Sequence, residues 1–155
     1  TLVLASGNET EFYDSESDTW QKASICQMGN DWRGIKGGQW IWVRDTVTKE
    51  EAITGTKKKL RLKFNLPSES ADSIRTAELL LRSEDACHIS VNDVRLVQEY
   101  GGAEYPDPFL IDIDQYVQVG DNTITFELVS YAKPDAKVPE DNLVGLIYRL
   151  HVEYS

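Results

Sequence analysis

The sequence predicts an all-β sandwich that folds as one domain over residues 1–155. Apolar and polar residues alternate in run after run from Gln39 onward, which is the pattern of half-buried strands. Clusters of Gly, Pro, Asn and Asp separate these runs, as turns do between strands. Apolar residues nowhere keep the 3.6-residue period of an amphipathic helix over a long stretch, so helix is expected only as short turns.

The expected strands follow one another along most of the chain. They cover residues 39–44, 59–66, 77–81, 87–91, 109–113, 124–128 and 146–154. Their alternating apolar members are expected to form the core: Leu62, Phe64, Leu79, Leu81, Ile89, Val91, Ile111, Phe126, Leu128, Tyr148, Leu150 and Val152. Residues 1–38 are less regular. We expect an edge strand at residues 1–5, with the rest of this segment packed on the sandwich.

Length and charge restrict the function. A domain of 155 residues buries roughly 68–70% of its unfolded surface, so it needs no metal or disulfide to fold. No apolar run approaches the roughly 18 residues of a membrane span, and the first residues lack the basic flank of a signal peptide. The formal net charge of −10 repels phosphate backbones and anionic lipid, so neither nucleic acid nor a membrane is expected as a partner.

The two cysteines, Cys26 and Cys87, leave two alternatives open. In an oxidising compartment they would pair, and the closed loop would stabilise the fold by roughly 4 kcal/mol in the chain-entropy model. Otherwise both are free and buried, as unpaired cysteines often are. With only His88 and His151 beside them, they do not form a zinc-binding pattern.

Four segments occur in an order that resembles the galactose-binding-like jelly roll. They are the glycine-rich entry to a Trp-Ile-Trp strand at 37–42, the strand and hairpin at 77–96, the Gly-Asp-Asn strand entry at 119–124, and the Asn-Leu-Val-Gly-Leu-Ile entry at 142–147. This superfamily includes many carbohydrate-binding modules and accessory domains of glycoside hydrolases. The resemblance covers about residues 37–154 and implies a jelly-roll sandwich of about eight to ten strands. It carries over no ligand-binding residue.

Motifs for catalysis are missing from the sequence. It contains no Gly-x-Ser-x-Gly elbow and no phosphate-binding loop. His88 and His151 alternate with core residues, so both are expected on solvated strand faces. The pair Glu84 and Asp85 is chemically suited to glycoside hydrolysis, but it lies at an expected turn, where acidic residues are common. We therefore expect a binding or connecting module and not an enzyme.

One acidic segment is a candidate calcium site. The resemblance implies that loop oxygens often hold one structural Ca²⁺ in this superfamily. Asp14, Glu16 and Asp18 alternate in YDSESDTW, and calcium prefers carboxylate and carbonyl oxygens. The glycine and the terminal Glu of an EF-hand loop are absent. The alternative is a solvated acidic stretch.

A glycan site needs flat aromatic rings that are exposed to solvent. Trp40 and Trp42 share one face of an expected strand and are expected to pack in the core or against the N-terminal segment. The expected ligand-binding residues are in loops: Trp32, Arg33, Tyr100, Tyr105 and Tyr131. A count of antiparallel strands places the segment before residue 39 and the loops at 67–73, 97–107 and 131–142 at one end of the sandwich. The loop aromatics would then share that end.

We therefore predict an extracellular or cell-surface carbohydrate-binding module whose partner is a polysaccharide or another glycan. The net charge of −10 favours a neutral or cationic polysaccharide. The alternative is a structural or adhesive module of a cell-surface protein, a pilus or a phage fibre. Further domains of a larger surface or secreted protein are expected partners in either case.

Overall fold

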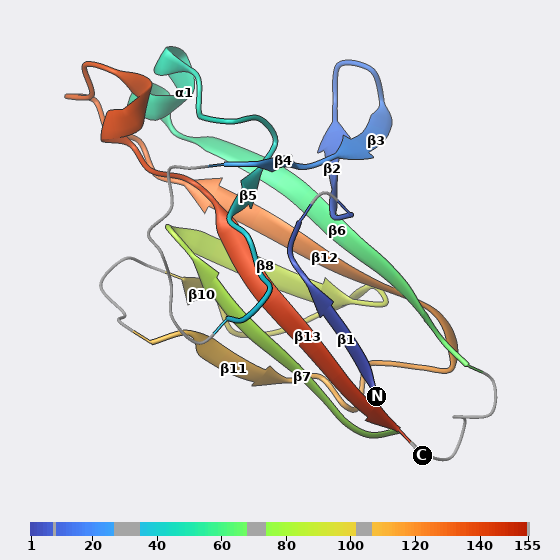
Figure 1. Cartoon of the computed structure of the whole chain (residues 1–155). Coiled ribbons are helices and arrows are strands. Elements are labelled where there is room, and N and C mark those ends of the chain that lie inside the picture. The colour runs from blue at the N-terminus through green and yellow to red at the C-terminus, as the bar shows by residue number, and fades with distance from the viewer. Residues whose placement is uncertain (8, 27–34, 68–73, 102–106, 155) are drawn as a thin grey trace.

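The computed structural model describes residues 1–7, 9–26, 35–67, 74–101 and 107–154. Within these ranges, strands form two antiparallel sheets that pack face to face (Figure 1). Sheet A has the order β11 (Phe109–Asp112), β7 (Ile74–Ser83), β13 (Leu146–Tyr154), β5 (Ile41–Trp42) and β4 (Ser24–Ile25), and β1 (Leu2–Ala5) also pairs with β13. Sheet B has the order β10 (Tyr100–Gly101), β8 (Ala86–Val91), β12 (Gly120–Ser130), β6 (Thr56–Leu66), β2 (Glu11–Asp14) and β3 (Thr19–Lys22), and β9 (Val94–Arg95) pairs with β8.

The core lies between the two sheets and confirms the alternation in the sequence. All twelve residues predicted for it are buried. The rings of Phe126 in sheet B and Tyr148 in sheet A stack with centroids 4.9 Å apart, which joins the two layers. Trp40 and Trp42 are 7% and 1% exposed, so both pack in the core as expected.

The strands outnumber the eight to ten that were predicted, because residues 1–38 contribute four of them. The expected edge strand is present as β1, and β2, β3 and β4 are short strands without clear alternation. The predicted strand at 39–44 is reduced to β5. Helix occurs in the described ranges only as the short α1 (Lys49–Thr54) and the 3-10 turn η2 (Pro139–Asp141). Neither is long and apolar enough to cross a membrane.

A capping box starts α1. The Thr48 hydroxyl accepts a hydrogen bond from the Glu51 backbone N–H, and the Glu51 carboxylate accepts one from the Thr48 backbone N–H. The Ala52 carbonyl then accepts hydrogen bonds from the Lys133 backbone and from the Asn142 side chain, each 2.9 Å long. These bonds hold α1 against the segment between β12 and β13 at one end of the sandwich (Figure 1).

The strand registers correct the predicted grouping of the loops. Thr56 pairs with Ser130 and Leu66 pairs with Gly120, so β6 and β12 end at opposite ends of the sandwich. The predicted sharing of one end by the loops after these two strands is therefore wrong. The count treated residues 87–96 as one strand, whereas the chain reverses at Asn92 and Asp93, which have positive φ angles of 48° and 67°.

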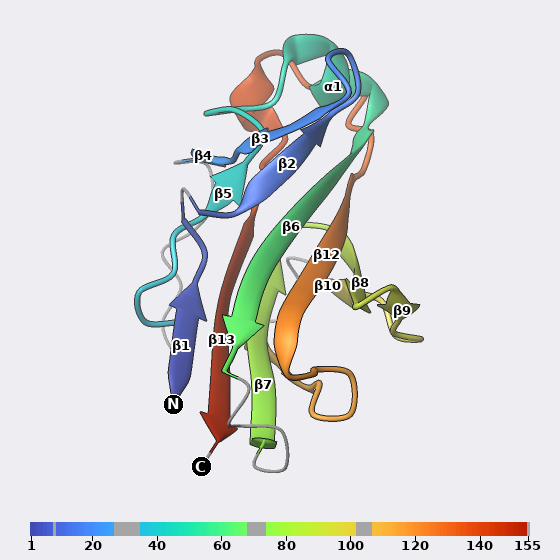
Figure 2. The ribbon, with the colours of Figure 1, turned by 90° about the vertical axis from the view of Figure 1, so that its right-hand side faces the viewer.

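Both cysteines are buried as thiols, so the fold has no Cys26–Cys87 disulfide. Burial raises the pKa of the Cys87 thiol far above its usual range, so this thiol stays protonated and unreactive. The two chain termini lie next to each other, away from α1 (Figure 2), where the Thr1 hydroxyl donates a 3.0 Å hydrogen bond to Glu153.

Candidate functional site

The outer face of sheet B carries the polar residues of its long strands. Side chains alternate between the two faces of a strand, and the inner positions of β6 and β12 are occupied by core residues. The outer positions of β6 are all basic from Lys57 to Lys63. Outer residues of the sheet include Lys57, Lys59, Arg61, Lys63, Thr123, Thr125, Glu127, His88 and Ser90. This face is therefore hydrophilic and open to a ligand.

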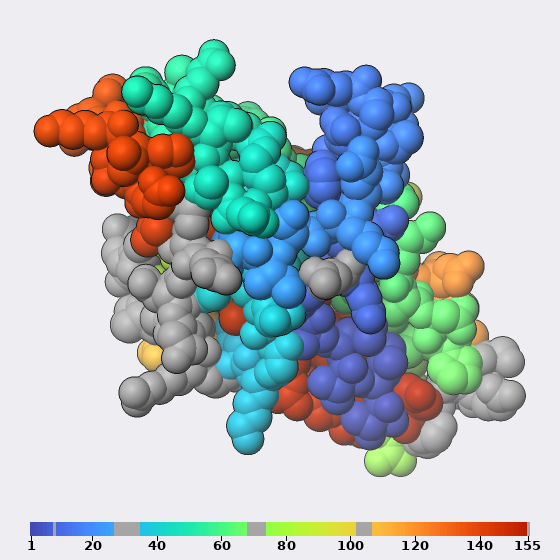
Figure 3. Space-filling model, turned by 45° about the horizontal axis from the view of Figure 1, so that its top comes forward, coloured from blue at the N-terminus to red at the C-terminus, as the bar shows by residue number. Residues whose placement is uncertain are grey.

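Two adjoining hollows lie on this face. The first has a volume of about 610 Å³ and the second of about 660 Å³. Both are lined by Lys59 and Glu127, which are direct partners in the β6–β12 register, so the hollows meet at this pair. The first hollow opens between the β2–β3 hairpin and the segment that carries α1 (Figure 3). We call the two hollows together the groove.

The β2–β3 hairpin supplies an aromatic wall to the groove. Tyr13 lines the first hollow and Trp20 lines the second, and their ring centroids are 5.5 Å apart at 59°. The Arg61 guanidinium lies 4.0 Å from the centre of the Trp20 ring, and its Nε donates a 2.9 Å hydrogen bond to Glu11. This cation–π contact fixes the indole on the edge strand, so the ring is held in place before any ligand arrives.

The other wall is formed by β8 and the β9 hairpin, which Figure 2 shows on the side of the sheet away from β2 and β3. Arg95 lies 3.7 Å from Glu127, and His88 lies 3.4 Å from Glu99. The Tyr131 hydroxyl donates a 3.3 Å hydrogen bond to the same Glu99, but neither of these two residues lines the groove. The groove therefore has charged donors and acceptors on the side opposite its aromatic wall.

The lysine run at residues 57–59 divides between two roles. All three residues lie inside β6, which begins three residues before the strand predicted at 59–66. Lys58 is on the inner side and forms a 2.8 Å ion pair with Glu51. Burial raises the pKa of Glu51, but its hydrogen bonds with Lys58, with the Thr48 backbone and with Arg44 outweigh that effect and lower the pKa to about 2. Lys57 and Lys59 lie on the outer side and line the first hollow, and Lys58 also contributes to its lining.

No model of a protein family matches the sequence, and no curated protein matches it. A family 35 carbohydrate-binding module from Paenibacillus barcinonensis superposes over 100% of both chains, with a TM-score of 0.50 and 11% identity. The lectin from Pleurotus ostreatus in complex with GalNAc matches 75% of this chain with a TM-score of 0.50 and 19% identity, and this chain spans 30% of its length. The chain has the galactose-binding-like β-sandwich fold.

Enzymes also contain this fold as a part of a longer chain. A putative β-galactosidase from Bacteroides fragilis matches 96% of this chain with a TM-score of 0.55 and 11% identity, but the match covers 23% of that protein. The predicted jelly-roll class is confirmed. The match to the carbohydrate-binding module covers the whole chain, so the likeness in fold extends over all of it.

The galactose-binding-like sandwich brings together two of the five predicted ligand-binding residues. Tyr100 lies opposite Cys87, and Tyr131 follows β12 at the same end of sheet B. The Tyr131 ring is 56% exposed. The Tyr100 ring instead packs edge-on against Phe109, with centroids 5.4 Å apart, so little of it is free for stacking. Trp32, Arg33 and Tyr105 lie outside the described residues.

The predicted calcium ligands are occupied by local hydrogen bonds. One Asp14 oxygen accepts from the Glu16 backbone, and the other accepts from Ser17 and Gln21. Asp18 accepts a hydrogen bond from the Tyr13 hydroxyl, which raises the pKa of Tyr13. In the described ranges, no group of three or more His, Cys, Asp or Glu side chains is arranged to hold a metal ion. The residues therefore do not fit a preformed calcium site, and binding stays a prediction.

Sequence reasoning missed the groove and most of the residues that line it. Tyr13 and Trp20 lie on strands of four residues, too short to show alternation, and were expected only to cover the sandwich. A signal for the floor was present: the polar residues that alternate with the core positions of β6 are Lys57, Lys59, Arg61 and Lys63. A strand whose outward-facing residues are all basic predicts a ligand-binding surface.

Proposed function

We propose that this chain is a non-catalytic carbohydrate-binding module and that its glycan lies in the groove on the outer face of sheet B. One observation carries the proposal: two adjoining hollows cross the sheet, with the rings of Tyr13 and Trp20 on one wall and a polar floor. Each hollow has the volume of a small-ligand site. The groove is open to solvent, as a site for an extended polymer has to be.

The chemistry of the groove suits sugars. The C–H face of a sugar ring stacks on a flat aromatic ring, while its hydroxyl groups need hydrogen-bond donors and acceptors. The Lys59–Glu127 pair, Thr125 and Ser90 supply such groups beside the aromatic wall. The likeness in fold to a carbohydrate-binding module and to a lectin supports the same class of ligand. Affinity should be micromolar or weaker, because a few stacking contacts must offset the cost of immobilising a polar ligand.

We place this activity outside the cell or on its surface, where polysaccharides are met, and we expect the module to act beside other domains. A structural or adhesive module remains the second candidate. The observation that favours it is Leu110 on the edge strand β11, which is 65% exposed. Exposed apolar residues on an edge strand promote pairing with another chain.

A glycan array with the isolated chain tests the proposal, followed by titration of the retained glycan. Trp20→Ala should reduce affinity about tenfold, which is about 1.4 kcal/mol. Its melting temperature should change little, because Trp20 lies on an edge strand. Tyr131→Ala is the matched control, since it removes an exposed ring at the loop end.

The two variants separate the possible sites. Loss of binding in Tyr131→Ala with full binding in Trp20→Ala would move the site to the loop end predicted from the sequence. If the array retains no glycan at all, the structural-module candidate is the better one.

A further inference from the structure

The charge of the groove differs in sign from the charge of the protein. We infer that the ligand is an anionic glycan, a linear polysaccharide that carries carboxylate or sulfate groups; this inference rests on the proposed function and specifies its ligand. The whole chain has a net charge of −10. The outer face of sheet B nevertheless carries more cations than anions. The strands of this face carry the cations Lys22, Lys57, Lys59, Arg61, Lys63 and Arg95 and the anions Glu11, Asp121 and Glu127. The hollows are also lined by Arg44 and Lys58 and by Asp14, Glu16 and Asp93, so cations remain in the majority.

The arginines already neutralise two of these anions. Arg61 pairs with Glu11 at 2.9 Å, and Arg95 lies 3.7 Å from Glu127. Among the described residues, no ion pair is formed by Lys57, Lys59 or Lys63, and the Asp121 carboxylate accepts a hydrogen bond from Asn65. Three ammonium groups on one strand are therefore available to pair with the acid groups of a ligand.

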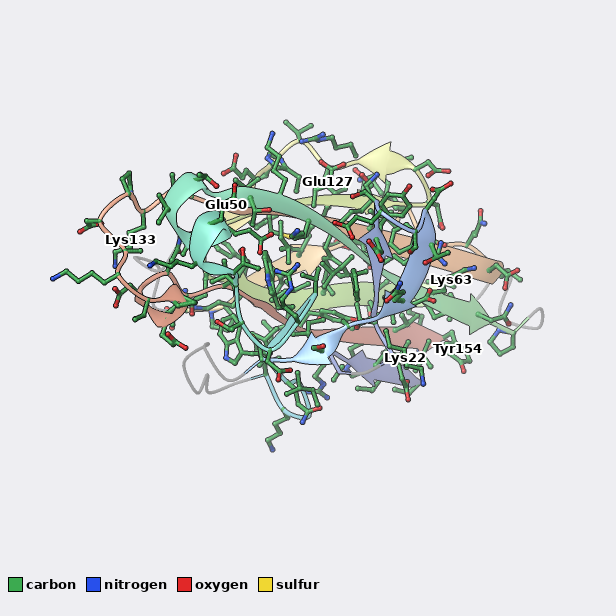
Figure 4. The ribbon with its side chains drawn as sticks, turned by 90° about the horizontal axis from the view of Figure 1, so that it is seen from above. Lys22, Glu50, Lys63, Glu127, Lys133 and Tyr154 are labelled. Carbon is green, nitrogen blue, oxygen red and sulfur yellow. The ribbon has the colours of Figure 1, made fainter. Side chains whose placement is uncertain are left out.

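The lysines are spaced for a chain and not for a single acid group. Alternate residues of a strand are roughly 6.7 Å apart, so the positions from Lys57 to Lys63 span about 20 Å along β6. Lys57 and Lys59 line the first hollow, Lys59 also lines the second, and Lys63 continues the row. In Figure 4, Lys63 and Glu127 come from the neighbouring strands β6 and β12 and Lys22 comes from β3. A linear polyanion along this row would meet one cation after another.

The charge near the groove, and not the net charge of the chain, decides which glycan is preferred. Ionic screening limits the interaction between exposed charges to about 8 Å at physiological ionic strength. The net charge of −10 led to the expectation of a neutral or cationic polysaccharide, but most of those acidic residues lie outside the groove. Lysine ammonium groups on flexible stems act as point charges, which tolerate variable spacing of the anionic groups on a polymer. The aromatic wall beside them provides stacking that a purely ionic surface lacks.

Binding to three polymers tests the inference: polygalacturonate for carboxylates, dextran sulfate for sulfates and unsubstituted dextran as the neutral probe. Affinity is measured for the full chain at about 50 mM and 300 mM salt, a range over which screening increases. We expect wild-type protein to bind at least one anionic polymer at least tenfold more tightly than dextran at the lower salt concentration, and to lose most of this advantage at the higher one. The two anionic polymers show which acid group is preferred.

Charge removal along the lysine row of β6 gives the matched comparison. The double variant Lys59→Gln with Lys63→Gln should reduce affinity for the anionic polymer at least tenfold. The control, Lys133→Gln with Lys137→Gln, removes the same charge from an exposed loop and should change affinity less than twofold. Lys59 and Lys63 are exposed, so the melting temperature should not change. If the double variant is unstable, the single Lys59→Gln variant should still reduce affinity at least threefold.

The outcomes separate failure of the anionic-glycan inference from failure of the proposed function. A neutral glycan from the array that binds in a Trp20-dependent way, with no effect of Lys59→Gln and no binding of either anionic polymer, overturns the inference and keeps the proposed function. If wild-type protein retains no glycan of any kind, both are wrong. Binding of an anionic polymer that is equally weakened by the control variant shows an unspecific charge effect and overturns the inference. Tighter binding to single-stranded DNA than to either polysaccharide also overturns it.

Discussion

The inner and outer faces of the β6–β12 pair differ completely, although alternate residues of the same two strands form them. The strands pair along their whole lengths, from Thr56 with Ser130 to Leu66 with Gly120. On the inner face, Leu60 and Phe126 are direct partners and are fully buried. One position further along, Arg61 and Thr125 are partners on the outer face and line the groove. Alternate residues of one ladder therefore serve stability and binding separately.

The largest expected effect tests this division on two adjacent residues. Phe126→Ala removes a buried ring that stacks on Tyr148, so it should reduce the free energy of unfolding by about 3–5 kcal/mol. Thr125→Ala, one residue away on the groove side, should change it by less than about 0.5 kcal/mol. Urea unfolding at pH 7 measures both. Similar effects of the two substitutions would contradict the separation of the faces.

The inner face was predictable from the sequence, because burial imposes a period of two on long strands. Phe64 and Ile124 could be assigned to the core without any structure for that reason. Asn122 is the instructive exception: it stands at an inner position and is 2% exposed. Its oxygen accepts hydrogen bonds from the Gln118 backbone at 2.8 Å and from Asn92 at 2.9 Å, and its amide donates to the Gln118 carbonyl at 2.7 Å. A buried polar residue is stable only with such partners, which alternation alone does not reveal.

The groove was not predictable in the same way, because it depends on how distant segments come together. Trp20 and Arg61 are forty-one positions apart in the sequence and lie in contact only because β2 joins β3 to β6. The predicted grouping of the loops was wrong for another reason, because the reversal at Asn92 was left out of the strand count. Tyr100 and Tyr131 still share one end, yet the Tyr100 ring is used in packing on Phe109. Exposure of a ring is a tertiary property, and its residue type and loop position do not determine it.

A smaller effect on the free energy of unfolding is expected from the ion pair between Glu51 and Lys58, the one lysine of the run on the inner side of β6. Its partner Glu51 has a pKa lowered to about 2 from an ordinary value of 4.5. The charged carboxylate therefore stabilises the folded state above about pH 4.5, and this stabilisation is lost as the pH falls from 4.5 toward 2. Because the site is partly exposed, screening reduces the contribution to about 1 kcal/mol.

Unfolding of wild-type protein and Glu51→Gln at several pH values measures that contribution. The variant keeps a side chain of the same shape at the capping position of α1 but removes its charge. The difference in unfolding free energy should be about 1 kcal/mol at pH 7 and should approach zero near pH 2. A difference that does not change with pH would show that Glu51 acts through capping and not through its charge. Glycan binding at pH 7 should be unaffected, since Glu51 lies outside the groove lining.

The smallest expected effect concerns calcium at the β2–β3 hairpin, which forms the aromatic wall. Calcium at Asp14, Glu16 and Asp18 would have to displace the hydrogen bonds that Ser17, Gln21 and Tyr13 now donate to two of these carboxylates. Binding should therefore be weak, with a dissociation constant of about 1 mM as in weak extracellular sites. At about 5 mM calcium, mass action then stabilises the folded state by about 1 kcal/mol, or roughly 2–4 °C in melting temperature.

Thermal melts with calcium and with a chelator decide whether the hairpin binds the ion. Asp14→Asn should abolish the increase in melting temperature with calcium, because Asp14 supplies two of the carboxylate oxygens at the turn. Asp121→Asn is the matched control: it removes a carboxylate from the outer face of sheet B, far from the hairpin turn in the chain, and should leave the increase intact. An unchanged melting temperature of wild-type protein at millimolar calcium would rule out the site. The wall would then be held by hydrogen bonds and the Arg61–Trp20 contact alone, which is consistent with carboxylates that already have donors.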